Sequence, residues 1–214
     1  MVEEPYDLNA KLFRLLFYRP KVDGKWIDNA IAIWTRLWNL KAPKNLICSH
    51  VEIWIPESNV FVKDGKFVGM CYSSTMGQIR SKNTIGDGVR KAPAADILKH
   101  PERWFYCQFD DVSKKNYEQL VCDMEKDIAN NQGYDMKLIW SFFWIRRDVD
   151  GDKDKYICSE FCFKHFKKLL AAENNFSPMA LKKIESLKTS MSPIRGAYTL
   201  YNKLGFEFHN LKGA

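Results

Sequence analysis

The stretch SHVEIWIP, residues 49–56, alternates polar and apolar side chains and ends at a proline. Such alternation is typical of a β-strand, because successive side chains point to opposite faces of a sheet. One face would carry three apolar residues, namely Val51, Ile53 and Ile55. The other face would carry His50, Glu52 and Trp54, and a carboxylate close to an imidazole can orient the ring and raise its basicity. The pattern therefore predicts a strand with a candidate general base, although a half-exposed strand without chemistry would give the same pattern.

A second stretch, YICSEFCFKH at residues 156–165, contains two cysteines and a histidine. The spacing of its apolar residues predicts a helix over residues 158–170. Cys158 would lie at the start of this helix, where backbone N–H groups and the helix dipole stabilise a thiolate. Cys162 follows one turn later among phenylalanines, so we expect it to be a buried, unreactive thiol. Cys158 is the candidate nucleophile, and an ordinary core cysteine is the alternative.

The rest of the chain predicts a mixed fold around these two stretches. Further strands are predicted at 13–19, on both sides of an Asp64-Gly65 turn and at 104–110, and helices at 24–38, 113–131, 134–147 and 179–187. Residues 77–103 are rich in Gly, Pro and charge and predict a long loop. Strands followed by helices indicate an α+β fold, an antiparallel sheet packed on helices, rather than alternating βαβ units. We expect one domain over residues 1–188 and an irregular C-terminal extension over 189–214.

The composition permits an anionic partner without naming one. The formal net charge is +7, yet the Lys and Arg residues are scattered and form no nucleic-acid motif, so no specific nucleic-acid partner is expected. The N-terminal segment MVEEPYDLNA lacks the pattern of a secretory signal, and the most apolar window, residues 138–145, is too short to span a bilayer. We therefore expect a cytoplasmic protein whose six cysteines are reduced thiols.

Two kinds of metal site are alternatives to a nucleophile. The predicted strand, the residue before it and the predicted helix hold five potential zinc ligands: Cys48, His50, Cys158, Cys162 and His165. Their spacing fits no common structural zinc pattern, and His165, with lysines on both sides, is expected on the surface. The acidic stretch DVDGDKD, residues 148–154, has lysine where an EF-hand loop needs glycine. We expect no metal and no cofactor.

Taken in order, FYRP, WIDNAIAIWTRLW, CSHVEIWIP, MCYSST, DGVR, WFYCQFD, YDMKLIWSFF and YICSEFC resemble the circularly permuted NlpC-type cysteine hydrolases. This papain-like group includes the YiiX-like proteins and bacteriophage relatives, and the resemblance covers roughly residues 13–187. It implies a papain-like core in which the histidine strand precedes the cysteine helix. It also implies that Cys158 is the nucleophile and His50 the general base.

The same resemblance implies a third polar residue beside the histidine, on its own strand or on the next one. Glu52 is the first choice, and Ser73, Ser74 and Thr75 are alternatives. Cys71 stands where many relatives have an acid or a histidine, so a non-catalytic member of the fold is also possible. The block CYSST followed by GVR is more similar to phage members than to cellular ones, which implies a viral or prophage origin.

These observations predict a thiol hydrolase, of cysteine peptidase or amidase type, that cleaves an amide, peptide or related acyl bond through an acyl-enzyme. The substrate would be a peptide, a peptidoglycan-like polymer or an acyl compound. A lipid-type acyltransferase is one alternative, with aromatic side chains as candidates to line an acyl groove: Trp54, Tyr156 and Phe161. A non-catalytic protein of the virion, or one that binds a host protein in the infected cell, is the other.

Overall fold

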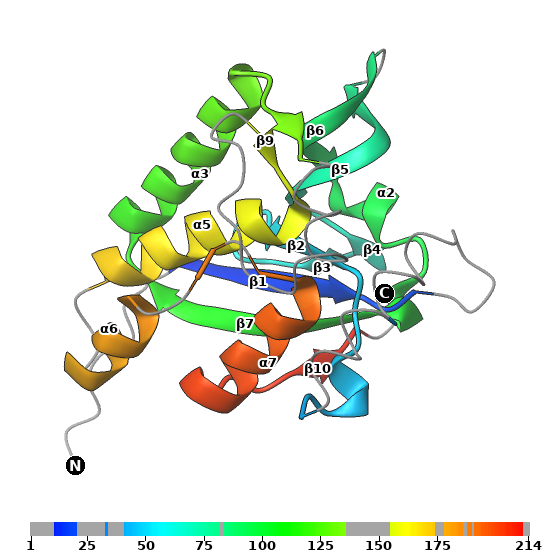
Figure 1. Cartoon of the computed structure of the whole chain (residues 1–214). Coiled ribbons are helices and arrows are strands. Elements are labelled where there is room, and N and C mark those ends of the chain that lie inside the picture. The colour runs from blue at the N-terminus through cyan, green and yellow to red at the C-terminus, as the bar shows by residue number, and fades with distance from the viewer. Residues whose placement is uncertain are drawn as a thin grey trace.

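The computed structural model describes residues 11–20, 33, 41–81, 84–135, 155–173, 178–185, 188–189 and 191–211. These residues form a mixed α+β fold in which helices pack on a six-stranded antiparallel sheet (Figure 1). The sheet has the spatial order β10-β7-β1-β2-β5-β6. Its strands are β1 (Lys11–Tyr18), β2 (His50–Ile55), β5 (Met70–Ser81), β6 (Thr84–Pro93), β7 (Trp104–Val112) and β10 (His209–Asn210). Two short pairs lie outside it: β3 (Val62–Lys63) with β4 (Lys66–Phe67), and β8 (Gly133–Tyr134) with β9 (Lys155–Tyr156).

The helices begin and end where local sequence signals favour it. They are α2 (Ala94–Ile97), α3 (Lys114–Ala129), α5 (Cys158–Ala172), α6 (Pro178–Glu185) and α7 (Pro193–Leu204), with 3₁₀ turns η1 (Lys44–Leu46) and η2 (Pro101–Arg103). The Ser113 side chain caps α3, and the Ser192 side chain caps α7, each by accepting a backbone N–H bond three residues on. Gly205 ends α7 in the left-handed conformation, at φ 75°.

The two faces of the sheet bury different sets of side chains. The helical face packs against α3, α5, α6 and α7, and its apolar strand residues include Phe13, Leu15, Phe17, Val51 and Ile53. The opposite face buries a smaller cluster that includes Leu16, Trp54, Cys71, Trp104 and Leu211. In Figure 1, α5 crosses the sheet beside β2 and β5, and it contacts both strands. The helix that begins at Cys158 is therefore fixed against the strand that begins at His50.

Several sequence predictions are confirmed in this fold. The stretch 49–56 forms β2, and its alternation puts Val51 and Ile53 into the helical core as expected. Asp64 and Gly65 join β3 to β4 with φ values of 50° and 69°, as a tight hairpin turn requires. Unlike the half-exposed strand considered above, β2 is buried on both faces after its first residue.

The predicted loop at 77–103 is wrong. This segment instead contains the end of β5, all of β6, α2 and η2, and β5 pairs with β6 from Met70↔Pro93 to Ser81↔Thr84. Its glycines do not break the ladder, because Gly88 pairs with Thr75 beside a register shift and takes a φ of 125° that other residues rarely adopt. The charged residues are also compatible with a strand, since β6 lies at the edge of the sheet.

The C-terminal segment is more regular than predicted. It forms α7 and then β10, which pairs with β7, and α7 contributes Ile194, Ala197 and Leu200 to the helical core. The predicted helices at 24–38, apart from Ile33, and at 134–147 beyond residue 135 lie outside the described residues, as does the acidic stretch 148–154. Among the residues that the structure describes, no helix is long and apolar enough to cross a membrane.

Candidate active site

His50 and Glu52 occupy the start of β2, an interior strand between β1 and β5. Their spacing of two residues puts both side chains on the same side of the strand. Glu52 is 1% exposed, whereas the His50 side chain is 20% exposed. The carboxylate is thus enclosed in the protein, and the imidazole remains partly accessible at the end of the strand.

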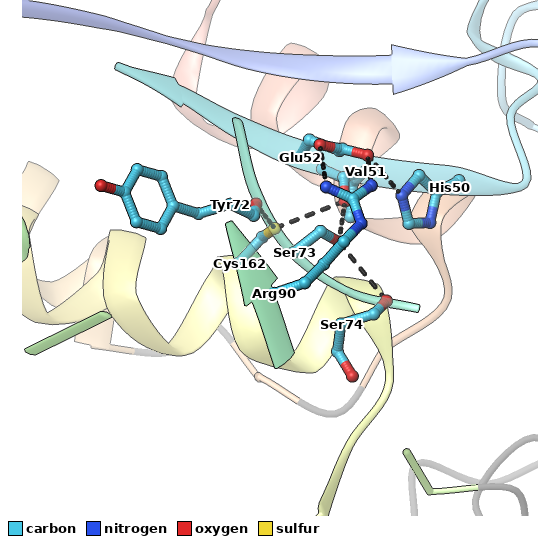
Figure 2. Close-up of polar contacts among 8 residues, drawn as sticks. All are labelled: His50, Val51, Glu52, Tyr72, Ser73, Ser74, Arg90 and Cys162. Carbon is cyan, nitrogen blue, oxygen red and sulfur yellow. Dashed lines mark hydrogen bonds and ion pairs between the residues drawn. The ribbon is translucent and has the colours of Figure 1, made fainter. Parts of the chain in front are cut away.

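A hydrogen bond joins these two side chains. Nε2 of His50 lies 3.0 Å from Oε1 of Glu52. On the other side of the carboxylate, the Arg90 guanidinium donates from Nη2 to Oε1 and from Nη1 to Oε2, the latter at 3.3 Å (Figure 2). Arg90 reaches Glu52 from β6 across β5, and it is 1% exposed. Burial alone would raise the pKa of the Glu52 carboxyl, but Arg90 and His50 together hold this pKa below its ordinary value.

Cys158 lies at the same ring. As the first residue of α5, it is 4% exposed and close enough to His50 to act on the pKa of the ring through charge and hydrogen bonding. Because Nε2 is hydrogen-bonded to Glu52, Nδ1 is the ring nitrogen that can exchange a proton with the sulfur of Cys158. Burial alone would lower the pKa of His50, but the charge and hydrogen bond of Cys158, with further contributions from Glu52, raise it to about 10. At neutral pH the ring is therefore an imidazolium, and a positively charged ring beside a sulfur is an arrangement that thiol catalysis uses.

The other cysteines have different surroundings. All six thiols are free, and Cys122 is the exposed one. Burial raises the pKa of Cys48, Cys71 and Cys162, which keeps these thiols protonated and unreactive. Cys162 is directed toward the backbone of β2, with its Sγ 3.5 Å from the carbonyl oxygen of Val51. Its burial agrees with the prediction that it is a core thiol.

The alternatives for the third residue make other contacts. The Ser73 hydroxyl donates to the carbonyl oxygen of Val51 at 2.8 Å, and the Ser74 hydroxyl donates to that of Tyr156 at 2.7 Å. Thr75 is buried at 6% exposure. Among these candidates, Glu52 is the one whose hydrogen bond to the His50 ring is observed. The geometry therefore favours Glu52 as the orienting residue.

The set considered for zinc is not assembled. Among the described residues there is no group of three or more His, Cys, Asp or Glu side chains that could hold a metal ion. The expectation that His165 lies on the surface is wrong, since it is 3% exposed and its Nε2 lies 2.9 Å from Oδ2 of Asp127 in α3. Two flanking lysines suggested exposure, but the histidine itself faces the α3–α5 contact.

The aromatic residues considered for an acyl groove belong to the core instead. Trp54 and Phe61 pack edge to face at 4.6 Å between ring centroids, and Tyr156 packs against Phe161 at 6.1 Å. Trp54, Tyr156 and Phe161 are 0%, 6% and 0% exposed, respectively. These three side chains therefore offer no surface to a ligand.

Arg90 is the site residue that sequence reasoning missed. It falls in the segment predicted to be a loop, and its partner Glu52 is 38 residues away in the chain. No local periodicity marks such a partner, because the contact depends on the order of strands β2, β5 and β6. The motif DGVR contains Arg90, but the sequence alone gave no reason to assign it a role.

Comparison of the chain with protein-family models, with curated proteins and with solved structures gave no match.

Proposed function

We propose that the protein is a cysteine hydrolase that cleaves an amide, peptide or related acyl bond. Cys158 would be the nucleophile, His50 the general acid and base, and Glu52 the residue that orients the ring. The observation that carries the proposal is the position of His50, whose ring lies 3.0 Å from Glu52 and whose pKa is raised by the neighbouring Cys158. A nucleophile, a base and an orienting acid in contact are the arrangement on which thiol catalysis depends.

The reaction begins from the thiolate of Cys158 and the imidazolium of His50. The sulfur attacks the carbonyl carbon of the substrate, the carbonyl π electrons move to its oxygen, and a tetrahedral intermediate forms. His50 then gives its proton to the leaving amine or alcohol, and an acyl-enzyme remains. The neutral ring next takes a proton from water, which attacks the acyl-enzyme and releases the acid together with Cys158.

The first turn of α5 supplies donors for the oxyanion in this scheme. The N-cap residue, Ile157, makes no side-chain cap, so no side chain at this position takes up the N–H groups of the first turn. The first hydrogen bond back along the helix runs from the Phe161 N–H to the Ile157 carbonyl at 3.0 Å. The N–H groups of Cys158 and Ser159 precede it, and backbone donors at a helix start are suited to an oxyanion.

The resemblance to permuted NlpC-type proteins supports the same proposal. A papain-like core needs a cysteine at the start of a helix that packs on an antiparallel sheet, beside a histidine at the end of a strand. Here α5 contacts β2 and β5, and the histidine strand comes first in the chain. We therefore infer a papain-like core in the permuted order, with Cys71 of β5 a buried thiol where many relatives carry a polar group.

Turnover and trapping test this function. The intact protein would be incubated with a panel of peptides, peptidoglycan fragments and lipid esters, followed by product analysis and mass spectrometry of the protein. We expect cleavage of one class and, in rapidly acid-quenched samples, an acyl adduct on Cys158. Cys158→Ala should abolish both signals, and Cys122→Ala, which alters an exposed thiol away from the site, should retain them.

The outcomes also separate the alternatives. Transfer of the acyl group to an added alcohol or amine in preference to water would identify an acyltransferase. A folded protein that forms no adduct with any member of the panel, and whose Cys158 does not react with an acyl probe, would contradict the hydrolase and favour a virion or host-interaction protein.

A further inference from the structure

The Glu52 carboxylate is held by two partners that differ in kind. One is the His50 ring, and the other is the forked guanidinium of Arg90, which binds both carboxylate oxygens. Oε1 is shared, since it accepts from Nη2 of Arg90 and lies 3.0 Å from Nε2 of His50. Arg90 therefore fixes the plane of the carboxylate, and this plane sets the direction in which Oε1 points toward the His50 ring (Figure 2).

We propose that Arg90 is a positioning residue for the candidate active site, which acts on Cys158 through Glu52 and His50. It keeps the Glu52 carboxylate ionised and aimed at Nε2, so that the ring presents Nδ1 to the sulfur. This inference rests on the proposed function, because it gives Arg90 a role in the reactivity of Cys158. Arg90 itself is not required to touch the substrate.

The burial of the pair supports a role beyond stability. Arg90 and Glu52 are each 1% exposed, and two buried charges lose much of their solvation. Apolar residues of similar volume often stabilise such a position as well or better. A bidentate arginine is required, however, wherever both oxygens of a carboxylate must be held in one plane, which a lysine cannot do.

Other titratable groups lie near the same carboxylate, and their effects on it must be distinguished from the effect of Arg90. Cys71 on β5 and Cys162 on α5 interact with both Glu52 and Arg90, but burial raises the pKa of each thiol and keeps it neutral. Cys48, which precedes β2, interacts with Cys158 and is neutral for the same reason. On β1, Tyr18 pairs in register with His50, and its hydroxyl accepts a hydrogen bond from Arg103 at 2.7 Å. Among the described residues, the positively charged groups that contact the Glu52 carboxylate directly are the Arg90 guanidinium and the His50 ring.

The test is the pH dependence of the alkylation of Cys158 by iodoacetamide, read by peptide mapping, which needs no substrate. Four proteins form a cycle: the wild type, Arg90→Gln, Glu52→Gln and the double variant. Without Arg90 the buried Glu52 becomes harder to ionise, and His50 then loses its carboxylate partner in acid. The acid limb is the pH range over which Cys158 stops reacting as the pH is lowered. In Arg90→Gln we expect this limb to lie about one pH unit higher than in the wild type, as for a carboxylate that loses an adjacent arginine.

Three comparisons decide the inference. Arg90→Lys retains the charge but cannot bind both carboxylate oxygens, so its acid limb should lie between those of the wild type and Arg90→Gln. In the Glu52→Gln background, removal of Arg90 should move the limb by less than about a third of that amount, because the carboxylate through which it acts is absent. If Arg90→Gln does not fold, Arg90→Lys takes its place, and it is compared with the wild type both with and without Glu52→Gln. The acid limb of Arg90→Lys should then move by a smaller amount, and only in the proteins that retain Glu52.

The contrary results are distinct. A normal acid limb in folded Arg90→Gln, with only a lower melting temperature, would make Arg90 a structural residue and overturn the inference while the hydrolase proposal stands. An equal shift with and without Glu52 would show that Arg90 does not act through Glu52. A wild-type Cys158 that does not react in acid would contradict both the inference and the proposed function.

Discussion

The Sγ atom of Cys162 lies 3.5 Å from the carbonyl oxygen of Val51, the residue that follows His50 in β2. The Ser73 hydroxyl of β5 donates to the same oxygen at 2.8 Å. This carbonyl therefore joins α5 and β5 to the strand that carries the histidine. One helical turn before Cys162, Cys158 meets the His50 ring instead, so the two cysteines of the helix have different roles.

Substitution of the two cysteines should separate these roles. Cys162→Ser should keep turnover and lower the free energy of unfolding by about 1 kcal/mol, since the shorter hydroxyl still has the Val51 carbonyl as an acceptor. Cys158→Ala should abolish turnover and leave the melting temperature nearly unchanged. Thermal melts and product assays on both variants check this. Loss of turnover in Cys162→Ser, together with full activity of Cys158→Ala, would show that the assignments are exchanged.

The His50 ring should remain protonated well above neutral pH. Its pKa is raised to about 10, against about 6.5 for a free side chain. An NMR titration of the histidine C2 protons measures this directly. Burial lowers the pKa and Cys158 contributes most to raising it, so Cys158→Ala should move the His50 titration to lower pH, and Glu52→Gln should do the same. A ring that titrates near pH 6.5 in the wild type would contradict the ion pair.

The same shift predicts how His50 contributes to stability. Because its pKa is higher in the folded protein, the folded state retains a proton that the unfolded state has released. The contribution is fully present below about pH 6.5 and is lost as the pH rises through about 10. The difference in unfolding free energy between the wild type and His50→Gln should therefore decrease across this window. A difference that is constant from neutral to alkaline pH would show that the ring does not titrate there.

The α3–α5 contact should depend on Asp127. Its carboxylate lies 2.9 Å from His165 and 3.2 Å from Lys164. Burial raises the pKa of Asp127, but these two partners lower it below its ordinary value. Asp127→Asn should reduce the unfolding free energy at neutral pH by about 1.5–3 kcal/mol, as expected for hydrogen bonds to a charged group.

The sign of the Asp127 effect with pH is fixed by its lowered pKa. The contribution is present above about pH 3.9 and is lost as the pH falls through the lower folded value. The control is Glu118→Gln on the same helix, whose exposed pair with Lys114 should contribute little. Chemical unfolding at neutral and acid pH checks both variants. If both substitutions lower the unfolding free energy equally, Asp127 does not stabilise the α3–α5 contact more than an exposed ion pair would.

The C-terminal helix should be essential to the packing of α5. A Cβ on Gly196 would lie 2.1 Å from Cε2 of Phe163, a ring that is 1% exposed and packs against Phe166. Alanine gains about 1 kcal/mol in helix propensity. Overpacking of a core costs about 1–3 kcal/mol, and a clash this close is at the upper end. Gly196→Ala should therefore lower the melting temperature, whereas Asn202→Ala on an exposed position of α7 should not. Equal melting of the two would mean that α7 does not pack as described.

Local sequence patterns predict the elements that carry the site but not all of their contacts. Period-two alternation places His50 and Glu52 together because both belong to one strand, and the apolar spacing around Cys158 identifies its helix. The contact between that helix and that strand joins residues about a hundred positions apart, and it was expected from resemblance rather than from periodicity.

The missed features all depend on pairing between distant residues. Arg90 is a charged residue in a glycine-rich segment, and only the order of the strands brings it to Glu52. His165 lies between polar neighbours, and only the α3–α5 contact supplies Asp127. Strand β10 is two residues long, too short for a local signal, and forms because β7 offers a free edge.

The measurement that tests the central claim most directly is competitive alkylation of the wild-type protein at about pH 6, where an ordinary thiol of pKa about 8.5 is almost fully protonated. Cys122, the exposed thiol, is the internal reference for labelling. Substoichiometric iodoacetamide followed by peptide mapping should label Cys158 first, and His50→Ala should remove this preference. Labelling of Cys122 before Cys158, or a preference for Cys158 that survives the loss of His50, would contradict the account.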